Sequence, residues 1–276
     1  MIDIDKLIND CEKELTSVYK DIDNNLLINS KKVLDAFHLH KVNESHFSTT
    51  TGYGYGDIGR EVTELVFATV LGGEASLVRT QFISGTHALS TCFFSLLRPG
   101  DLLLSITGTP YDTIKKVIGI EENSSSLKAF GIIYDEIDLL DNNFDIDKIT
   151  TYLKNNKVKV IEIQRSKGYS TRKSILVSQI KEVIEKIREV DKDVIIMVDN
   201  CYCEFVEPIT PLEVGADVIV GSLIKNLGAG IAPNGGYICG KKELVFLASE
   251  RLNVAGQGSE VGPTNNMNKV FLQGLF

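Results

Sequence analysis

The chain has 276 residues, of which 43% are hydrophobic and 24% charged, and its formal net charge is -8 at pH 7. This composition is typical of one large α/β domain and provides no basic surface for nucleic acid. No apolar run of about 18 residues occurs, and the amino terminus does not resemble a signal peptide. We therefore expect a cytoplasmic protein without a membrane partner. The five scattered cysteines are expected to be free thiols, and their spacing predicts no metal site.

Two domains are predicted. Residues 1–56 form a helical arm that ends in a loop rich in glycine, threonine and tyrosine at 47–59. Asp57 then caps the first helix of the larger domain, residues 57–276, and Arg60 lies in its first turn. The predicted helices cover residues 3–21, 28–41, 58–71, 86–97, 110–119, 145–155 and 176–190.

Apolar strand patterns alternate with these helices along the larger domain. Alternation of this kind indicates an α/β fold, with a mostly parallel sheet of about seven strands flanked by helices. A further helix begins at Lys241, and the sequence ends in the apolar, uncapped run NKVFLQGLF, which we interpret as a truncated end. The predicted strands are 77–83, 101–106, 128–134, 157–163, 194–198, 217–221 and 235–239.

An acid and a lysine follow two successive strands. Asp199 ends the run DVIIMVD, and the next strand is followed by Ser222 and Lys225. The carboxyl ends of parallel strands meet at one edge of a sheet, where ligands bind. Taken singly, the acid is more often a cap and the lysine is more often solvated. Together, they match a pyridoxal-phosphate site, in which the acid pairs with the ring nitrogen, the lysine forms an imine and the serine holds the phosphate.

Two segments upstream supply the remaining parts of such a site. Ser84, Gly85, Thr86 and His87 connect a strand to a helix, and backbone N–H groups at a helix start attract phosphate. The alternative is a plain turn with a helix cap. Tyr111 follows the next strand, where it can stack on a pyridine ring and move protons. A structural helix-start tyrosine remains the alternative, and His87 is a second candidate for the stacking role.

These motifs resemble a known family. The segment VDNCYCEFVEPITPLEVGADVIVGSLIKNLGAG is similar to the VDN…P…GAD…S-x-x-K…G segment of fold-type I pyridoxal-phosphate enzymes of cysteine and methionine metabolism. SGTHALSTCFFSLLRPGDLLLS resembles their phosphate loop and helix. With TTGYGYGDIGRE, they resemble most closely the methionine γ-lyase-like or aluminium-resistance branch. The resemblance runs from about residue 30 to the end, and implies an aminotransferase-like large domain whose small C-terminal domain is missing.

The resemblance also implies roles for individual residues. Tyr55 and Arg60 take the place of a tyrosine and an arginine contributed by the neighbouring subunit, although their spacing differs. This implies a homodimer or homotetramer with the active site at the subunit interface. Lys225 would hold the cofactor as an imine, Asp199 would pair with the ring nitrogen, Ser84, Gly85, Thr86 and Ser222 would bind phosphate, and Tyr111 would stack on the ring and protonate the leaving group.

The sequence departs from the family pattern in two places. Where the family has an asparagine that approaches the ring hydroxyl, this chain reads IQRSKGY, so Gln164 or Arg165 would substitute for it. The arginine that binds the substrate carboxylate belongs to the C-terminal domain and would lie beyond Phe276.

The predicted function is a carbon–sulfur lyase that uses pyridoxal 5'-phosphate to eliminate a thiol from a sulfur amino acid. The elimination would be of the cystathionine β-lyase or methionine γ-lyase type. An aldolase or aminotransferase on the same scaffold is the first alternative, and His87 fits an aldolase. A catalytically weak stress-response protein is the second. A nucleotide-binding domain is disfavoured because neither G-x-G-x-x-G nor G-x-x-x-x-G-K-[ST] occurs.

Overall fold

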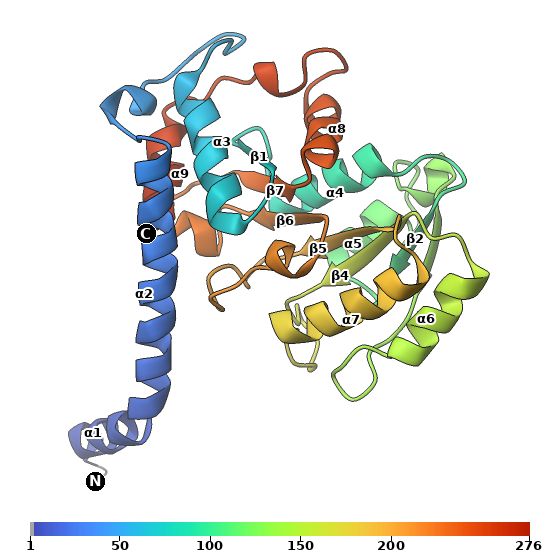
Figure 1. Ribbon diagram of the computed structural model, residues 1–276, viewed down its shortest axis with the longest axis horizontal. Coiled ribbons are helices and arrows are strands. Elements are labelled where there is room, and N and C mark those ends of the chain that lie inside the picture. Colours follow the sequence, from blue (N-terminus) through green and yellow to red (C-terminus); the bar gives the residue numbers. More distant parts are fainter. Residues whose placement is uncertain (1–2) are drawn as a thin grey trace.

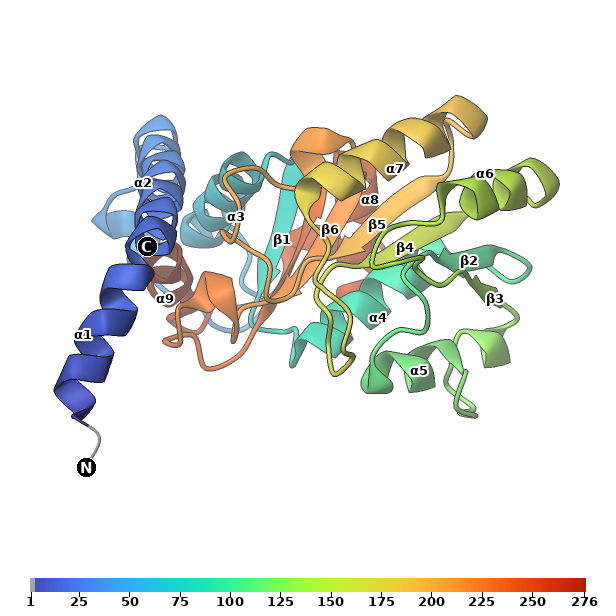
Figure 2. The same ribbon diagram turned by 90° about the horizontal axis from the view of Figure 1, so that it is seen from below.

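A computed structural model describes residues 3–276. Over these residues, a seven-stranded sheet lies between two layers of helices (Figures 1 and 2). Strand β7 runs antiparallel to both of its neighbours, β1 and β6, and the remaining pairs are parallel. The mostly parallel α/β fold predicted from the sequence is thus confirmed. In spatial order, the strands are β1 (Ala75–Arg79), β7 (Gly236–Gly240), β6 (Val218–Ser222), β5 (Ile195–Asp199), β4 (Val160–Gln164), β2 (Leu102–Ser105) and β3 (Ile133–Glu136).

The central strands are buried on both faces, which explains their continuous apolar runs. Successive side chains point to opposite faces, so Val198 and Ile219 join one core and Met197 and Val220 join the other. Helices α3, α6, α7 and α9 cover the first face, and α4, α5 and α8 the second. Figure 2 shows α6 and α7 on one side of the sheet and α4 and α5 on the other. The helices span α3 (Ile58–Leu71), α4 (Gly85–Leu96), α5 (Asp112–Ile118), α6 (Ile146–Asn155), α7 (Val177–Val190), α8 (Lys242–Leu252) and α9 (Met267–Gly274).

The amino-terminal arm differs from its prediction. Helix α1 (Ile4–Glu14) meets α2 (Thr16–Leu39) at Leu15, so the predicted break over 22–27 was wrong. Asn25 donates from its side-chain amide to the carbonyls of Phe205 and Val206, and these contacts hold the stretch helical against the body of the protein. Most of the arm projects beyond the sheet (Figures 1 and 2).

Two other elements correct the sequence prediction. The strand predicted at 128–134 begins later, as β3, because residues 128–130 form a 3-10 turn that Gly131 ends with a φ of 83°. Helix α9 was not predicted. The cap at Asp57 is confirmed, since its side chain accepts the N–H of Arg60 at 2.8 Å. In the part of the chain that is described, no helix is long and apolar enough to cross a membrane.

Candidate active site

Asp199 and Lys225 lie at the same edge of the sheet. Asp199 is the last residue of β5, is buried, and accepts a hydrogen bond from the backbone N–H of Cys201 at 3.0 Å. Lys225 follows β6, with its Nζ 4.1 Å from the centre of the Tyr202 ring. Burial raises the pKa of Asp199, and the charge of Lys225 opposes that change. The two residues therefore form an electrostatically coupled pair.

The pKa of Lys225 is raised in the protein alone. Burial lowers it, but the interactions with Cys201 and Asp199 outweigh burial. The pKa of the Cys201 thiol is itself well above its usual range, because the side chain is desolvated. The Lys225 ammonium therefore lies near two groups, Asp199 and Cys201, whose own pKa values are raised by burial.

A cavity of about 390 Å³ opens at this edge. Its volume lies within the usual range for a small-ligand pocket. The structure here brings together Tyr111, Asp199 and Lys225, which the sequence placed in one site. The lining residues are Tyr111, Ser166, Lys167, Gly168, Tyr169, Ser174, Asp199, Cys201, Tyr202 and Lys225.

The predicted phosphate cradle is formed where α4 meets the end of β6. Ser84 caps α4 by accepting the N–H of His87 at 3.1 Å. The start of the helix packs tightly on the strand, because a Cβ at Gly85 would lie 3.0 Å from Ser222 Cβ. Ser222 Oγ is buried and has no hydrogen-bond partner within residues 3–276. A buried hydroxyl without a partner, beside a helix N-terminus, fits a phosphate group.

Tyr111 lines the cavity and contacts the predicted phosphate cradle through Thr86. Its hydroxyl lies 3.1 Å from Thr86 Oγ1, and Thr86 Oγ1 in turn lies 2.9 Å from Thr113 Oγ1. Burial, and then the charge of Asp199, raises the pKa of the Tyr111 phenol. The phenol therefore stays protonated and remains a hydrogen donor at neutral pH.

Gln164 and Arg165 hold the walls of the cavity instead of lining it. Gln164 accepts the backbone N–H of Tyr111 and donates to the carbonyl of Ser166 at 3.0 Å. Arg165 is buried and binds the carbonyl of Cys203, the side chain of Asn200 and the carboxylate of Glu207. Neither is among the described residues that line the cavity. Contact of either side chain with a cofactor ring stays a prediction.

Seven other predicted residues also lie outside the lining: Ser84, Gly85, Thr86 and Ser222 of the phosphate cradle, and His87, Tyr55 and Arg60. His87 accepts the backbone N–H of Ile83 at Nδ1, and its ring packs edge-on against Phe82. Tyr55 is exposed on the loop before α3, and Arg60 is buried with its guanidinium on the carbonyls of Gly54, Glu260 and Gly262. Contributions of Tyr55 and Arg60 to a neighbouring subunit stay predictions.

Two features of the cavity were not predicted from the sequence. Tyr202 adopts a left-handed backbone with φ 67°, which is uncommon for a non-glycine residue and gives no sequence signal. The loop of residues 166–174 forms one wall and is organised by Arg172, which donates to the carbonyls of Gln164 and Ser166. Its position after β4 is the signal that could have found it.

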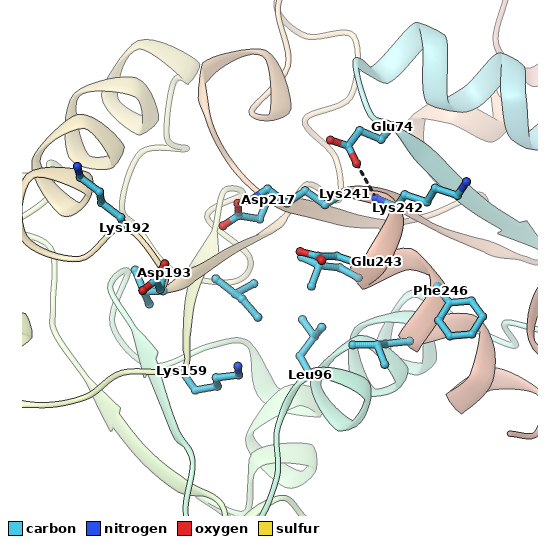
Figure 3. A pocket seen from close by; sticks show the side chains of 14 residues that line it. Glu74, Leu96, Lys159, Lys192, Asp193, Asp217, Lys241, Lys242, Glu243 and Phe246 are labelled. Carbon is cyan, nitrogen blue, oxygen red and sulfur yellow. Dashed lines mark hydrogen bonds and ion pairs between the residues drawn. The ribbon is translucent and has the colours of Figure 1, made fainter.

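A wider cavity of about 1060 Å³ lies at the opposite edge of the sheet (Figure 3). Lys159, Asp193 and Asp217 line it where β4, β5 and β6 begin. Asp217 is bound by Lys241 at 2.8 Å, and Glu74 accepts the backbone N–H of Lys242. Ligands of parallel α/β sheets bind at the carboxyl ends of strands, so the smaller cavity is the candidate active site.

The geometry of that cavity agrees with a comparison against known families. A model described as methionine gamma-lyase matches residues 4–276. The chain belongs to the methionine gamma-lyase family. Enzymes of this family depend on pyridoxal phosphate, for which the orphaned Ser222 hydroxyl and the Asp199–Lys225 pair are suitable partners.

Several relatives are similar to nearly the whole length of this chain. YnbB, an uncharacterized Bacillus subtilis protein, is 46% identical over 98% of the chain and 65% of its own length. A Listeria monocytogenes structure provisionally named a cystathionine beta-lyase involved in aluminium resistance is 46% identical, with a TM-score of 0.96 and coverage of 98% and 69%. A carbon–sulfur lyase involved in aluminium resistance from Clostridium novyi is 43% identical, with a TM-score of 0.94 and coverage of 98% and 65%.

The fold extends to a more distant protein. An Escherichia coli protein described as pyridoxal-5'-phosphate dependent, YhfS, is 18% identical and has a TM-score of 0.68, over 92% of this chain and 63% of its own. This likeness shows the fold alone. The chain thus spans only about two thirds of the length of the proteins it resembles, 65% in the case of YnbB.

Proposed function

We propose that the protein is a carbon–sulfur lyase that uses pyridoxal phosphate to act on a sulfur amino acid. The observation that carries the proposal is the single cavity in which Tyr111, Asp199 and Lys225 meet, beside the unpartnered hydroxyl of Ser222. The family match, and the names of the Listeria and Clostridium relatives, support the same class of reaction.

The residues of the cavity have distinct roles in this proposal. Ser222 Oγ and the backbone at Gly85 and Thr86 would hold the phosphate, and Asp199 would hold a proton on the ring nitrogen. The bound cofactor would supply an electron sink for carbanion chemistry at the substrate α-carbon. Lys225 is the amine that can bind the cofactor and move a proton at Nζ.

Tyr111 is the proposed proton donor to the departing sulfur. Its raised pKa keeps the phenol protonated at neutral pH, and its oxygen is held 3.1 Å from Thr86 Oγ1. Sulfur leaves more readily as a neutral thiol than as a thiolate. A phenol that protonates the departing sulfur therefore favours elimination. The aldolase alternative has weaker geometric support, because the His87 ring packs edge-on against Phe82 and its Nδ1 accepts the backbone N–H of Ile83.

Two measurements test the proposal. The purified protein is incubated with pyridoxal phosphate, and we expect a visible absorbance band and, after borohydride, a mass increase on the peptide that carries Lys225. Lys241→Ala, at the opposite edge of the sheet, is the matched control and should bind pyridoxal phosphate as the wild type does. An unmodified Lys225 would overturn the proposal. Thiol release is then assayed with cystathionine, cysteine, homocysteine and methionine, and production of glycine and an aldehyde from a β-hydroxy amino acid would indicate an aldolase instead.

We further propose a homodimer or homotetramer, with the active site completed across the interface. Support comes from the arm, where Leu7, Ile8, Leu15, Ile22 and Leu26 are exposed apolar residues on neighbouring turns. Exposed apolar faces of this extent often mark protein interfaces. Light scattering of the wild type and of a Leu15→Glu, Ile22→Glu variant measures the oligomer. A monomeric wild type would contradict the proposal.

A further inference from the structure

The turn that follows β5 places an aromatic ring against Lys225. Lys225 Nζ lies 4.1 Å from the centre of the Tyr202 ring, and both residues line the candidate active site. The face of an aromatic ring carries partial negative charge and attracts a cation within about 6 Å of its centre. The Lys225 ammonium and the Tyr202 ring are therefore in cation–π contact inside the cavity.

The backbone of Tyr202 is held in an unfavourable conformation. Its φ of 67° lies in the left-handed region, which bulky residues seldom adopt. The turn is fixed on both sides, because the N–H of Cys201 donates to the Asp199 side chain at 3.0 Å and the N–H of Cys203 donates to the carbonyl of Asn200 at 3.0 Å. Both cysteines are buried. Strained residues that their surroundings hold in place cluster at functional sites, so the orientation of this ring calls for a functional explanation.

Other ionisable groups also surround Lys225. Burial lowers the pKa of its amine, whereas Cys201, Asp199 and, last, Tyr202 raise it. Within residues 3–276, Lys225 forms no ion pair with a carboxylate. No ion pair therefore duplicates the contact between the ammonium and the ring. The surrounding groups are Asp199, Cys201 and Glu204 after β5, Tyr111 at the start of α5, and Lys167 in the loop after β4.

We propose that Tyr202 is a positioning residue that holds Lys225 as an ammonium ion over its ring until the cofactor binds the amine. The ring attracts the cation far more strongly than the neutral amine, so it favours the protonated form of the lysine. A lysine must lose this proton before it can act as a nucleophile. This inference rests on the proposed function of Lys225, and it adds a residue that fixes the position of the lysine and the pH at which it becomes reactive.

The test measures the reactivity of Lys225 in the absence of the cofactor. The full chain is labelled with acetic anhydride, which reacts with neutral amines, across a pH series, and mass spectrometry quantifies acetylation of Lys225. Tyr202→Leu removes the ring, so the midpoint for labelling should fall by about half a pH unit. Tyr202→Phe keeps the ring and should retain the wild-type midpoint. Tyr169→Leu is the matched control and should also retain it, because this exposed tyrosine lines the same cavity but forms no cation–π contact within residues 3–276.

A further variant covers misfolding of Tyr202→Leu. Tyr202→Gly also removes the ring, and glycine adopts the left-handed backbone without strain, so its midpoint should fall by the same amount. A wild-type midpoint in either variant, once folded, would overturn the inference and leave the proposed function intact. A fall in Tyr202→Phe as large as in Tyr202→Leu would also overturn it, since the hydroxyl and not the ring would then act on the lysine. Failure of wild-type Lys225 to bind pyridoxal phosphate would instead remove the proposed function, and the labelling midpoints would still report on the ring.

Discussion

The backbone N–H of Tyr111 donates to the side-chain oxygen of Gln164 at 2.8 Å, so the last residue of β4 fixes the start of α5. The side-chain NH2 group of Gln164 donates to the carbonyl of Ser166. One side chain thus holds two walls of the cavity, a structural role for Gln164 that the sequence did not predict.

Replacement of Gln164 by leucine tests this role. Tyr111 would lose its acceptor, so we expect the free energy of unfolding to fall by about 1–3 kcal/mol and the affinity for pyridoxal phosphate to fall as well. Denaturant unfolding and absorbance titration measure the two effects. Gln179→Leu is the control, because its amide bonds to Leu176, Asn142 and Asn143, remote from the cavity. An unchanged cofactor affinity in Gln164→Leu would show that the two walls are held by other contacts.

Ser222→Ala should act with opposite signs on stability and on binding. Among the residues that the structure describes, Ser222 Oγ has no hydrogen-bond partner, so its removal should leave the free energy of unfolding unchanged or raise it by up to about 1 kcal/mol. If the hydroxyl binds phosphate, the dissociation constant for pyridoxal phosphate should rise about 10- to 100-fold.

The control for Ser222 is another buried serine, Ser95, whose hydroxyl donates to the carbonyl of Cys92 at 2.7 Å. Ser95→Ala should cost about 1 kcal/mol of stability without changing the affinity. A clear loss of stability in Ser222→Ala would mean that the hydroxyl is already paired, and the phosphate assignment would fail.

Glu162 should make the protein less stable as the pH rises. Burial raises its pKa to about 8 from 4.5, so the folded state binds the proton that the unfolded state has released. The geometry agrees, because Ser105 Oγ has one proton but contacts both Gly108 O at 2.8 Å and Glu162 Oε2 at 2.7 Å. A protonated Glu162 donates to Ser105 Oγ and satisfies both contacts.

The contribution of Glu162 is fully present below about pH 4.5 and is lost as the pH rises to about 8, with a slope of at most about 1.4 kcal/mol per pH unit. Glu162→Gln should flatten this dependence and gain stability relative to the wild type at pH 8. Thermal unfolding across pH 5 to 8.5 measures it. Identical slopes in the two proteins would show that Glu162 ionises as readily when folded as when unfolded.

Asp217 is expected to be important for stability but not for binding. It is buried and binds Arg188 at 2.6 Å, Lys241 at 2.8 Å and the N–H of Ile196 at 2.7 Å. Asp217→Asn weakens the contacts with both cations and should cost roughly 1–3 kcal/mol. Lys241→Ala, whose side chain is half exposed, should cost about 1 kcal/mol or less. Cofactor affinity measured on folded protein should be unchanged in both variants, and a loss would link the two edges of the sheet.

Much of the site followed from the sequence for a simple reason. Continuous apolar runs predict parallel strands, and the residue after each strand lies at one edge of the sheet, so Tyr111, Asp199 and Lys225 could be assigned to one cavity. What could not be predicted depends on contacts between distant residues. Helix α2 continues through Asn25 because of a carbonyl 180 residues away. The buried carboxylate of Glu204 accepts a hydrogen bond from Tyr237, which lies 33 residues further along the chain.

The antiparallel pairing of β6 with β7 has a dynamic consequence. The segment that carries Lys225 leaves the sheet at Ser222 and returns at Gly236, which are register partners, and Leu223 donates to the carbonyl of Gly235 at 3.0 Å. Gly228 packs so closely on Leu223 that the loop has no room for an added side chain. Local fraying therefore cannot release the lysine on its own. Amide hydrogen exchange in this loop and in both strands should proceed as one cooperative unit, so the position of Lys225 is as stable as the hairpin that carries it.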